Sequence, residues 1–314
     1  MKYILKKAGM MLLTLFVVSV LVFLAFNLIP GDPATRILGI EATENQLAIL
    51  REEMGLNDPL YVRYFRWVWA FIHGDLGQSY SYGSVSELIL DKIPITIWLA
   101  IMAFILMIVI SIPLGIFTAR HEGGTIDKVV VVLDQIIMAI PPFFSGIILT
   151  LVFGLTLHLF VPGGYVSYKK DFWGFIKYLI FPAIAIALPK ITMSVKLLRG
   201  SVIDEISKDY TRTAYSRGNT TRGVLYRHVL KNAMIPVITF MGMALADMVS
   251  GSIVIEQVFN IPGLGRMLLT SINNRDYPVV EAIIMGIAIL VMVVNFIVDI
   301  IYRLVDPRIE TIKD

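Results

Sequence analysis

The chain has 314 residues, of which 57% are hydrophobic and 16% are charged, and its formal net charge is +3. Soluble domains carry charges on about a quarter of their residues, so this composition predicts a protein of the lipid bilayer. A net charge this small does not indicate a nucleic-acid partner. The chain has no cysteine, which excludes disulfides, zinc–thiolate sites, iron–sulfur clusters and cysteine nucleophiles.

Six apolar stretches are long enough to cross a membrane, because a hydrocarbon core about 30 Å thick needs about 20 apolar residues per helix. In chain order they are approximately residues 8–29, 95–119, 129–160, 178–198, 234–255 and 279–304. The first follows Lys2, Lys6 and Lys7 as in a signal peptide, but it exceeds the roughly 7–15 residues of a signal peptide's apolar region. We therefore expect a retained membrane anchor.

Two of these stretches contain a pair of prolines. Pro141 and Pro142 lie in the third stretch, and Pro182 and Pro189 lie in the fourth. Proline lacks a backbone N–H and its ring clashes with the preceding helical turn. Both pairs therefore predict kinks or partial unwinding of a membrane helix.

Basic residues concentrate on one side of the predicted spans. An even number of spans places both chain ends on that side, together with Arg120, Lys128 and the basic residues from Arg199 to Lys231. By the positive-inside rule this side is cytoplasmic, so we expect cytoplasmic N and C termini. Lys169, Lys170 and Lys177 on the opposite side weaken this assignment without reversing it.

The spans predict three parts of the chain: a cytoplasmic segment with the first helix (1–30), an extracytoplasmic loop domain (31–94), and a five-helix core (95–314) with a cytoplasmic loop at about 200–233. In the loop domain, Thr43 and Gln46 match a capping box ahead of a short amphipathic helix. A second helical pattern there gathers aromatic and aliphatic residues on one side: Tyr61, Tyr64, Phe65, Val68, Trp69 and Ile72. It indicates an aromatic interfacial helix or, alternatively, a cap over a substrate entrance.

The loop at about 200–233 has the pattern of a helix, a tight turn and a second helix. Gly218 is suited to end the first helix, and Thr220 or Thr221 is suited to begin the second. Apolar residues at helical spacing predict the first helix: Val202, Ile203, Ile206 and Tyr210. Because membrane spans hold both ends of this hairpin against the bilayer, entry into a DNA groove is implausible, and we expect no nucleic-acid partner.

A run of residues in this loop forms a recognisable motif: Asp209, Tyr210, Thr211, Arg212, Thr213, Ala214, Gly218, Arg227, His228, Asn232, Ala233, Ile235 and Pro236. Further short motifs occupy residues 74–77, 262–266, 274–278 and 306–308. Together they resemble the permeases of bacterial ABC importers, and more narrowly the first permease subunit of the dipeptide, oligopeptide and nickel group. The resemblance covers essentially the whole chain.

The loop departs from the broader permease family at two places. That family reads Glu-Ala-Ala, three residues, Gly, nine residues, Ile, one residue and Leu-Pro. Here Arg212 replaces the Glu and Lys231 replaces the Pro, as is usual in the peptide and nickel branch. The departure narrows the subfamily, and it weakens the case for a carboxylate at this place in contact with an ATPase.

The resemblance implies an all-α membrane protein with about six transmembrane helices, similar to a type I ABC-importer permease with a cytoplasmic coupling-helix loop. It implies a channel subunit in a bacterial or archaeal cell (inner) membrane that moves peptides, nickel or a related small solute inward. The implied partners are a second homologous permease subunit, two ABC ATPase subunits, an extracytoplasmic solute-binding protein and membrane lipids.

The chain has no Gly-x-x-x-x-Gly-Lys-Ser/Thr loop to cradle ATP phosphates. Gly218 and Gly223 have the spacing of the two glycines, but the next residue is Val224 where this motif has a lysine. We therefore expect no enzymatic activity and no cofactor on this chain, with ATP and Mg used by the partner ATPase subunits.

Seven loop residues are the candidates for coupling to an ATPase: Asp209, Arg212, Thr213, Ala214, Gly218, Arg227 and His228. The small residues among them would let a short helix enter a cleft on another protein, and arginines would supply forked hydrogen-bond donors around it. The alternative interpretation is that the arginines only set the topology and bind anionic lipid headgroups.

Ionisable residues inside a span are costly and usually face a protein interior or a water-filled path, which concerns Asp134, Asp247 and Asp299. Asp247 lies near Ser250 and Gly251, on a small-residue surface that suits either a substrate path or close helix packing. A carboxylate there would suit a cationic group such as a peptide amino terminus or a metal chelate. Asp134 and Asp299 lie nearer the ends of spans, where we expect structural pairing.

The four histidines are scattered and predict no metal site, and no catalytic constellation of Ser, His and carboxylate is visible. Two other classes of protein make different demands on these residues. An ion-coupled secondary transporter would use Asp247 and Asp299 to bind its coupling ion, and a membrane enzyme would need the missing constellation. The substrate stays open among dipeptides, oligopeptides, nickel and related solutes, with peptides favoured.

Overall fold

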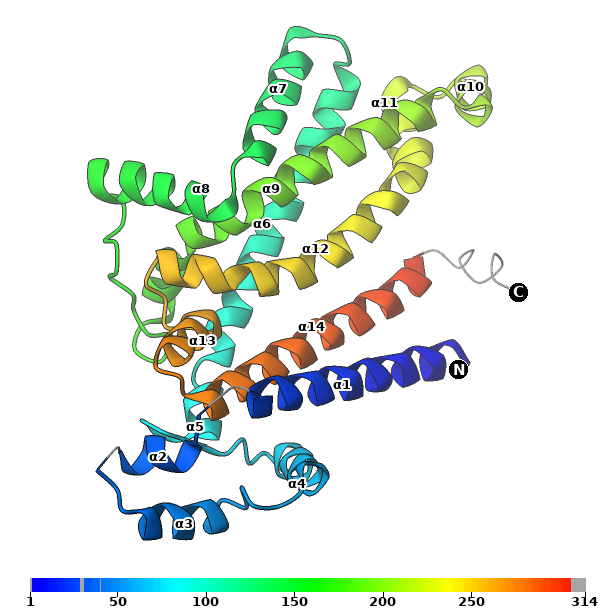
Figure 1. Cartoon of the computed structure of the whole chain (residues 1–314). Helices are drawn as coiled ribbons and strands as arrows, with labels where there is room; N and C mark the ends of the chain where they lie inside the picture. The colour runs from blue at the N-terminus through cyan, green and yellow to red at the C-terminus, as the bar shows by residue number, and fades with distance from the viewer. Residues whose placement is uncertain (1, 29–30, 40, 306–314) are drawn as a thin grey trace. The chain divides into compact units, whose positions relative to one another are not determined.

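The computed structural model describes residues 2–28, 31–39 and 41–305, and most of these residues are helical (Figure 1). The motif residues Asp306, Pro307 and Arg308 lie outside the described residues. The helices, with π-helical segments named η, are α1 Lys2–Leu28, α2 Pro33–Leu38, α3 Glu44–Glu53, α4 Leu60–Ile72, α5 Val85–Leu90, α6 Ile93–Arg120, α7 Thr125–Ala139, α8 Pro142–Leu149, η1 Thr150–Thr156, α9 Phe172–Ile206, α10 Asp209–Ser216, α11 Thr221–Val224, η2 Leu225–Val229, α12 Leu230–Val258, α13 Leu264–Asn273 and α14 Tyr277–Val305. Two short strands, β1 Gln78–Ser79 and β2 Gly83–Ser84, form an antiparallel hairpin that pairs Gln78 with Ser84.

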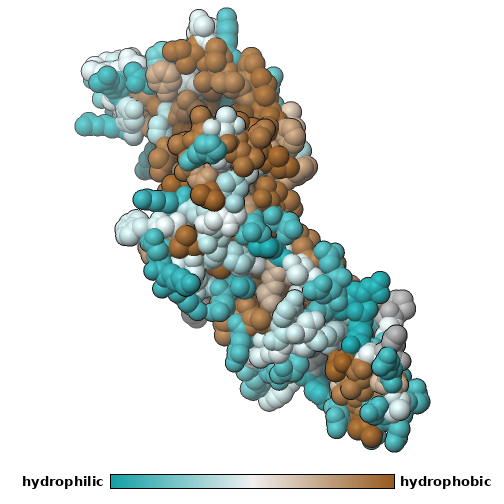
Figure 2. Space-filling model, turned by 90° about the vertical axis from the view of Figure 1, so that its left-hand side faces the viewer, coloured by the Kyte–Doolittle hydropathy of each residue, from teal (hydrophilic) through white to brown (hydrophobic). Residues whose placement is uncertain are grey.

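Five helical stretches of the described chain are long and apolar enough to cross a membrane, and a bent pair of helices raises this number to six if the pair is one span. The prediction of about six transmembrane helices is therefore confirmed. Figure 2 shows broad apolar patches on the surface of the chain, as expected for helices that face lipid. On α7 and α8 the exposed apolar residues include Ile126, Val129, Val132, Leu133, Ile136, Phe143, Phe144 and Ile147.

The first proline pair breaks the third predicted span. α7 ends at Ala139, α8 begins at Pro142, and the two segments meet at an angle of 103°. Ile140 and Pro141 have extended backbones, with ψ angles of 122° and 143°. The residue before a proline is disfavoured in the helical region, so two consecutive prolines force both residues out of the helix.

The second proline pair does not unwind its helix, and the alternative of a kink at Pro182 or Pro189 stays a prediction. The α-helix α9 runs without interruption from Phe172 to Ile206 through both residues. Neighbouring helices compensate for a missing hydrogen bond inside a membrane protein. α9 packs against α12, α7 and α8, and Pro182 is itself buried.

The chain divides into two compact units, one of which consists of Met1–Ile95 and Gly263–Met292. In this unit, the predicted capping box is confirmed: Thr43 Oγ1 accepts from the backbone of Gln46, whose side chain accepts from the backbone of Thr43. The aromatic pattern predicted after it forms α4.

The β hairpin is held by the buried carboxylate of Asp276, which accepts hydrogen bonds from Ser79 Oγ and from the backbone N–H of Tyr80 at 3.1 Å.

The second unit consists of Thr96–Pro262 and Val293–Asp314, and the packing of α9 against α12 lies at its centre (Figure 1). Most of the buried residues of both helices are small or aliphatic. At one end of α12, the fully buried Glu256 accepts a hydrogen bond from Thr96 Oγ1 on α6 at 2.6 Å. Nearby, the hydroxyl of Tyr178 on α9 donates to the carbonyl of Phe259 and accepts from the backbone N–H of Gly163 at 3.1 Å.

A buried ion pair joins α7 to α9. The Asp127 side chain is 4% exposed and binds the Arg199 guanidinium at both oxygens, with distances of 2.6 and 2.8 Å. It also accepts from the backbone N–H of Gly123, in the turn that precedes α7, at 2.9 Å. A bidentate pair of this kind fixes both distance and orientation, so it sets how α7 docks on α9.

We expect Asp127→Leu to lower the free energy of unfolding by about 3 kcal/mol, because it leaves the Arg199 guanidinium partly buried and without its carboxylate. The double variant Asp127→Leu, Arg199→Leu should recover most of this loss. Thermal unfolding of the purified chain in detergent measures both effects. Arg66→Leu, which removes an exposed ion pair with Asp58, is the matched control and should change the midpoint little. A double variant as unstable as Asp127→Leu would contradict this account.

Candidate functional site

The loop between α9 and α12 folds as a helical hairpin of α10, α11 and η2, which we call the α10–η2 hairpin (Asp209–Val229). The prediction of two short helices around a tight turn is confirmed, although the first boundary differs. The apolar residues Val202, Ile203 and Ile206 belong to the end of α9, and only Tyr210 belongs to α10. Ser207 and Lys208 separate the two helices, and Lys208 has an extended backbone with a ψ angle of 152°.

The turn of the hairpin depends on residues with special backbone or capping roles. Gly218 has a φ angle of +81°, a left-handed conformation that glycine adopts without steric cost, and it ends α10 as expected. Asn219 Nδ2 then donates to the carbonyl of Ala214 at 2.9 Å. Thr220 is the N-cap of α11, where its Oγ1 accepts from the backbone N–H of Gly223 at 3.2 Å. These contacts give the hairpin one defined geometry.

The hairpin has an inner face and an outer face. Its inner face is formed by five buried residues: Thr211, Ala214, Val224, Leu225 and Val229. Six of the seven coupling candidates lie on the outside and are exposed: Asp209, Arg212, Thr213, Gly218, Arg227 and His228. Ala214 is the exception, since it is 6% exposed and packs inward. The small side chain at this position therefore lets α10 lie close to the rest of the hairpin.

A polar network ties the base of the hairpin to both long helices. Glu205, at the end of α9, accepts hydrogen bonds from Lys208 Nζ and from the Tyr210 hydroxyl. The side chain of Asn232, at the start of α12, bonds to both Glu205 and Tyr210. Burial, followed by the bond to Glu205, raises the pKa of the Tyr210 hydroxyl. The hydrogen bond to Glu205 raises the pKa of the Lys208 ammonium.

The three residues proposed for a substrate path lie together on one face of α12. Asp247, Ser250 and Gly251 are exposed, and Met243 and Val254 extend the same exposed stripe at helical spacing. An added Cβ at Gly251 would meet no atom within 4 Å. Within the described chain, this face of α12 is therefore open, and the close packing considered as an alternative does not occur at Gly251.

Asp247 forms an ion pair that the sequence reasoning missed. Its Oδ2 lies 2.6 Å from Nζ of Lys190 on α9, and the side chains are 62% and 26% exposed, respectively. Lys190 lies inside the fourth predicted span, where a charged residue is itself a signal of function or pairing. Lys196, further along the same span, is likewise the charged group that acts on the buried Asp134 of α7.

Buried Glu256 is a second residue that the sequence reasoning did not single out, because it lies just beyond the predicted end of the fifth span. Among the described residues, no group of three or more His, Asp or Glu side chains could hold a metal ion. Among the described residues, the predicted coupling and substrate-path residues thus lie on the α10–η2 hairpin and on the stripe of α12.

Two family models match the chain. Residues 111–311 match the family described as "Binding-protein-dependent transport system inner membrane component", and residues 1–100 match the N-terminal family of the same membrane components.

Curated relatives match over nearly the full length. A probable peptide ABC transporter permease protein of Sinorhizobium fredii is 34% identical, covering 98% of this chain and 99% of the relative. An oligopeptide transport system permease protein of Bacillus subtilis is 37% identical with the same coverage. A glutathione transport system permease protein of Salmonella paratyphi A is 35% identical over 99% of both chains.

Removal of the Tyr210 hydroxyl should loosen the base of the hairpin. We expect Tyr210→Phe to reduce the protection of α10 amides against hydrogen exchange about fivefold, since a hydrogen bond to a carboxylate contributes about 1 kcal/mol or more. Hydrogen-exchange mass spectrometry of the purified chain measures this. Tyr215→Phe is the matched control, because Tyr215 is exposed. Equal protection in both variants would show that the network does not hold the hairpin.

Proposed function

The chain belongs to the family of binding-protein-dependent transport system inner membrane components, and on this premise we propose that it forms an import channel for short peptides. Members of the family are permease subunits of ABC importers, so the chain is a channel subunit of such an importer. The observation that supports a peptide cargo is that relatives named for peptides, oligopeptides and glutathione match nearly the whole chain at 34–37% identity. No comparison supports an ion-coupled secondary transporter.

The chain is one component of a larger assembly, since an importer of this family works with ATPase and binding-protein components. We propose two ATPase subunits, which use ATP and Mg, and a second homologous permease that completes the channel. The positive-inside pattern supports cytoplasmic termini and a cytoplasmic α10–η2 hairpin. The segment of residues 31–94 then lies on the side of the solute-binding protein.

The outer face of the α10–η2 hairpin is the proposed contact with an ATPase subunit. Its exposed residues include four arginines, Arg212, Arg217, Arg222 and Arg227, which offer planar donors to carboxylates of a partner. The polar network at Glu205 and Asn232 joins the hairpin to α9 and α12. A displacement of the hairpin would therefore move both long helices together. Ala214 and Gly218 contribute by shaping the hairpin, through inward packing and a left-handed turn respectively.

The exposed stripe of α12 is the proposed wall of the substrate path. A polar stripe with an ion pair would be unfavourable against lipid, but it suits a surface that faces water or a second permease subunit. Asp247 and Lys190 neutralise each other, so the wall carries no net charge at this position. Such a wall would pass peptides whose side chains differ in charge.

Charge reversal on the hairpin tests the coupling proposal. We expect Arg212→Glu to lower recovery of the ATPase subunits in co-purification at least fivefold. The substitution replaces an exposed hydrogen-bond donor with a negative charge, which repels any carboxylate of the partner. Arg120→Glu, at the exposed end of α6, is the control and should retain the ATPase. Gly218→Trp is a poorer test, because a side chain at a φ angle of +81° strains the turn itself. Full recovery with Arg212→Glu would contradict the proposed contact.

Charge removal on α12 tests the substrate path. Asp247→Asn leaves the Lys190 cation in the wall and should lower uptake of a lysine-containing dipeptide, relative to an aspartate-containing one, about fivefold. This corresponds to about 1 kcal/mol between unit charges in a watery path. Lys190→Met should have the opposite preference, and the double variant should restore even uptake. Reconstituted vesicles with all partner subunits measure this, and an unchanged preference in all three variants would exclude this face from the path.

A further inference from the structure

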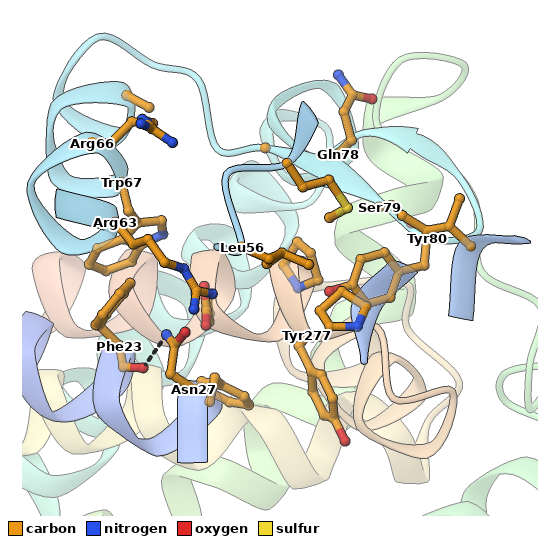
Figure 3. Close-up of a pocket in the computed structure, with 18 of the residues that line it drawn as sticks. Phe23, Asn27, Leu56, Arg63, Arg66, Trp67, Gln78, Ser79, Tyr80 and Tyr277 are labelled. Atoms are coloured by element: carbon orange, nitrogen blue, oxygen red, sulfur yellow. Dashed lines mark hydrogen bonds between the residues drawn. The ribbon is translucent and has the colours of Figure 1, made fainter. Parts of the chain in front are cut away.

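A cavity of about 890 Å³ lies within the unit formed by Met1–Ile95 and Gly263–Met292 (Figure 3). It is bounded by the ends of α1 and α3, by α4, by the β hairpin and by the start of α14. This volume is in the range of small-molecule binding sites, about 300–1,000 Å³. The coupling hairpin and the α12 stripe belong to the other unit, so neither proposed site accounts for this cavity.

Aromatic rings form much of the cavity wall. Phe23 and Trp67 contact each other, with ring centroids 5.9 Å apart, and Tyr80 and Tyr277 lie together on another side of the cavity (Figure 3). Burial, followed by the negative charges of Glu281 and Asp276, raises the pKa of the Tyr80 hydroxyl. Tyr80 is therefore neutral at physiological pH and keeps its proton as a hydrogen-bond donor. Walls of this kind accept an apolar side chain beside a polar group.

Two opposite charges face this cavity without a protein partner. Arg63 and Glu281 are both half-buried and line the cavity, and within the described ranges neither side chain makes a hydrogen bond or an ion pair. Burial disfavours the charged form of the Glu281 carboxyl group, and the Arg63 cation opposes this effect, as the ammonium of a bound ligand would. The other lining arginines are paired: Arg51 lies 2.8 Å from Asp32, and Arg66 lies 2.7 Å from Asp58.

Half-buried charges without a partner lose hydration energy, which a ligand of complementary charge restores. A guanidinium binds a carboxylate through two parallel hydrogen bonds, and a carboxylate binds an ammonium. No ion pair joins Arg63 to Glu281 among the described residues, so each group is open to one end of a ligand with two charged ends. The aromatic walls would then contact the apolar part of that ligand.

We propose that this cavity binds the zwitterion of a short peptide, with its carboxylate at Arg63, its ammonium at Glu281 and an apolar side chain against Phe23 and Trp67. The inference rests on the proposed peptide cargo. It adds a site outside the α12 stripe, on the segment that would face the solute-binding protein, where a released peptide is held before it enters the channel.

Direct binding to the transporter assembled without its solute-binding protein tests the site. The assembly is placed in nanodiscs of phosphatidylcholine and phosphatidylglycerol, and isothermal titration calorimetry measures binding of alanyl-phenylalanine, its N-acetylated form and its C-amidated form. We expect Arg63→Gln and Glu281→Gln each to weaken binding of the unmodified dipeptide at least tenfold. Glu53→Gln, at an exposed carboxylate outside the cavity, should have no effect.

The blocked dipeptides keep the test independent of whether a variant folds. Acetylation of the amino terminus should weaken binding to the wild type, but it should not weaken binding to Glu281→Gln any further. In the same way, amidation of the carboxyl terminus should weaken binding to the wild type but not to Arg63→Gln. Wild-type affinities that are equal for blocked and unblocked dipeptides would overturn the proposal. So would unchanged affinity in both charge variants.

Phosphatidylethanolamine carries a similar pair of charges and is the other source of such a ligand. The peptide assignment is overturned if the wild type binds no dipeptide in these nanodiscs but retains phosphatidylethanolamine in native mass spectra, and if both variants lose this lipid.

Uptake with the solute-binding protein separates the proposed site from the proposed cargo. Wild-type peptide uptake without dipeptide binding at the cavity would overturn this site alone, whereas absent uptake of any peptide would overturn the proposed cargo.

Discussion

The need to give every charge inside an apolar span a partner organises the core of this protein. Helix α9 carries Lys190 and Lys196 inside the predicted fourth span and Arg199 directly after it, and each of these cations acts on a carboxylate of another helix. Two of those carboxylates, Asp134 and Asp127, lie seven residues apart on α7 and so fall on one face of it. α7 thereby docks on α9 in a single register, while most of its other residues are apolar. The third carboxylate, Asp247, belongs to α12, and its pair with Lys190 lies on an exposed face instead of a sealed one.

The number and sequence positions of the spans were predictable from hydropathy, because lipid imposes a minimum apolar length on each membrane helix. The same reasoning underestimated the lengths of the helices. The fourth span was expected at 178–198 and the fifth at 234–255, whereas α9 and α12 extend beyond both ends of those windows. Apolar length reports the thickness of the bilayer, and a helix continues past it wherever its backbone remains unbroken. Capping at Thr43 and Thr220 was local and therefore visible in the sequence, as was the turn at Gly218.

Contacts between distant segments could not be read from the sequence in the same way. Asp127 and Arg199 are 72 residues apart, and Thr96 and Glu256 are 160 residues apart, so no local pattern reports that they meet. The effect of proline was equally context-dependent. The consecutive Pro141 and Pro142 break one span, whereas α9 continues as a helix through Pro182 and Pro189. Ala214 shows the limit of a motif. An eight-residue helix must bury one face, and the helical period places residues 211 and 214 on it while residues 212 and 213 face outward.

The unbroken course of α9 has a mechanical consequence. A helix of 35 residues is about 52 Å long, and the hydrocarbon core is about 30 Å thick, so α9 projects well beyond the bilayer. One end is capped by Asp171, and the other meets the network at Glu205. Such a rod amplifies small rotations: a tilt of about 10° about one end moves a point halfway along it by roughly 4 Å. Lys190 lies near that halfway point and is paired with Asp247, so a small movement where the rod leaves the membrane would shift this ion pair by about the width of a side chain.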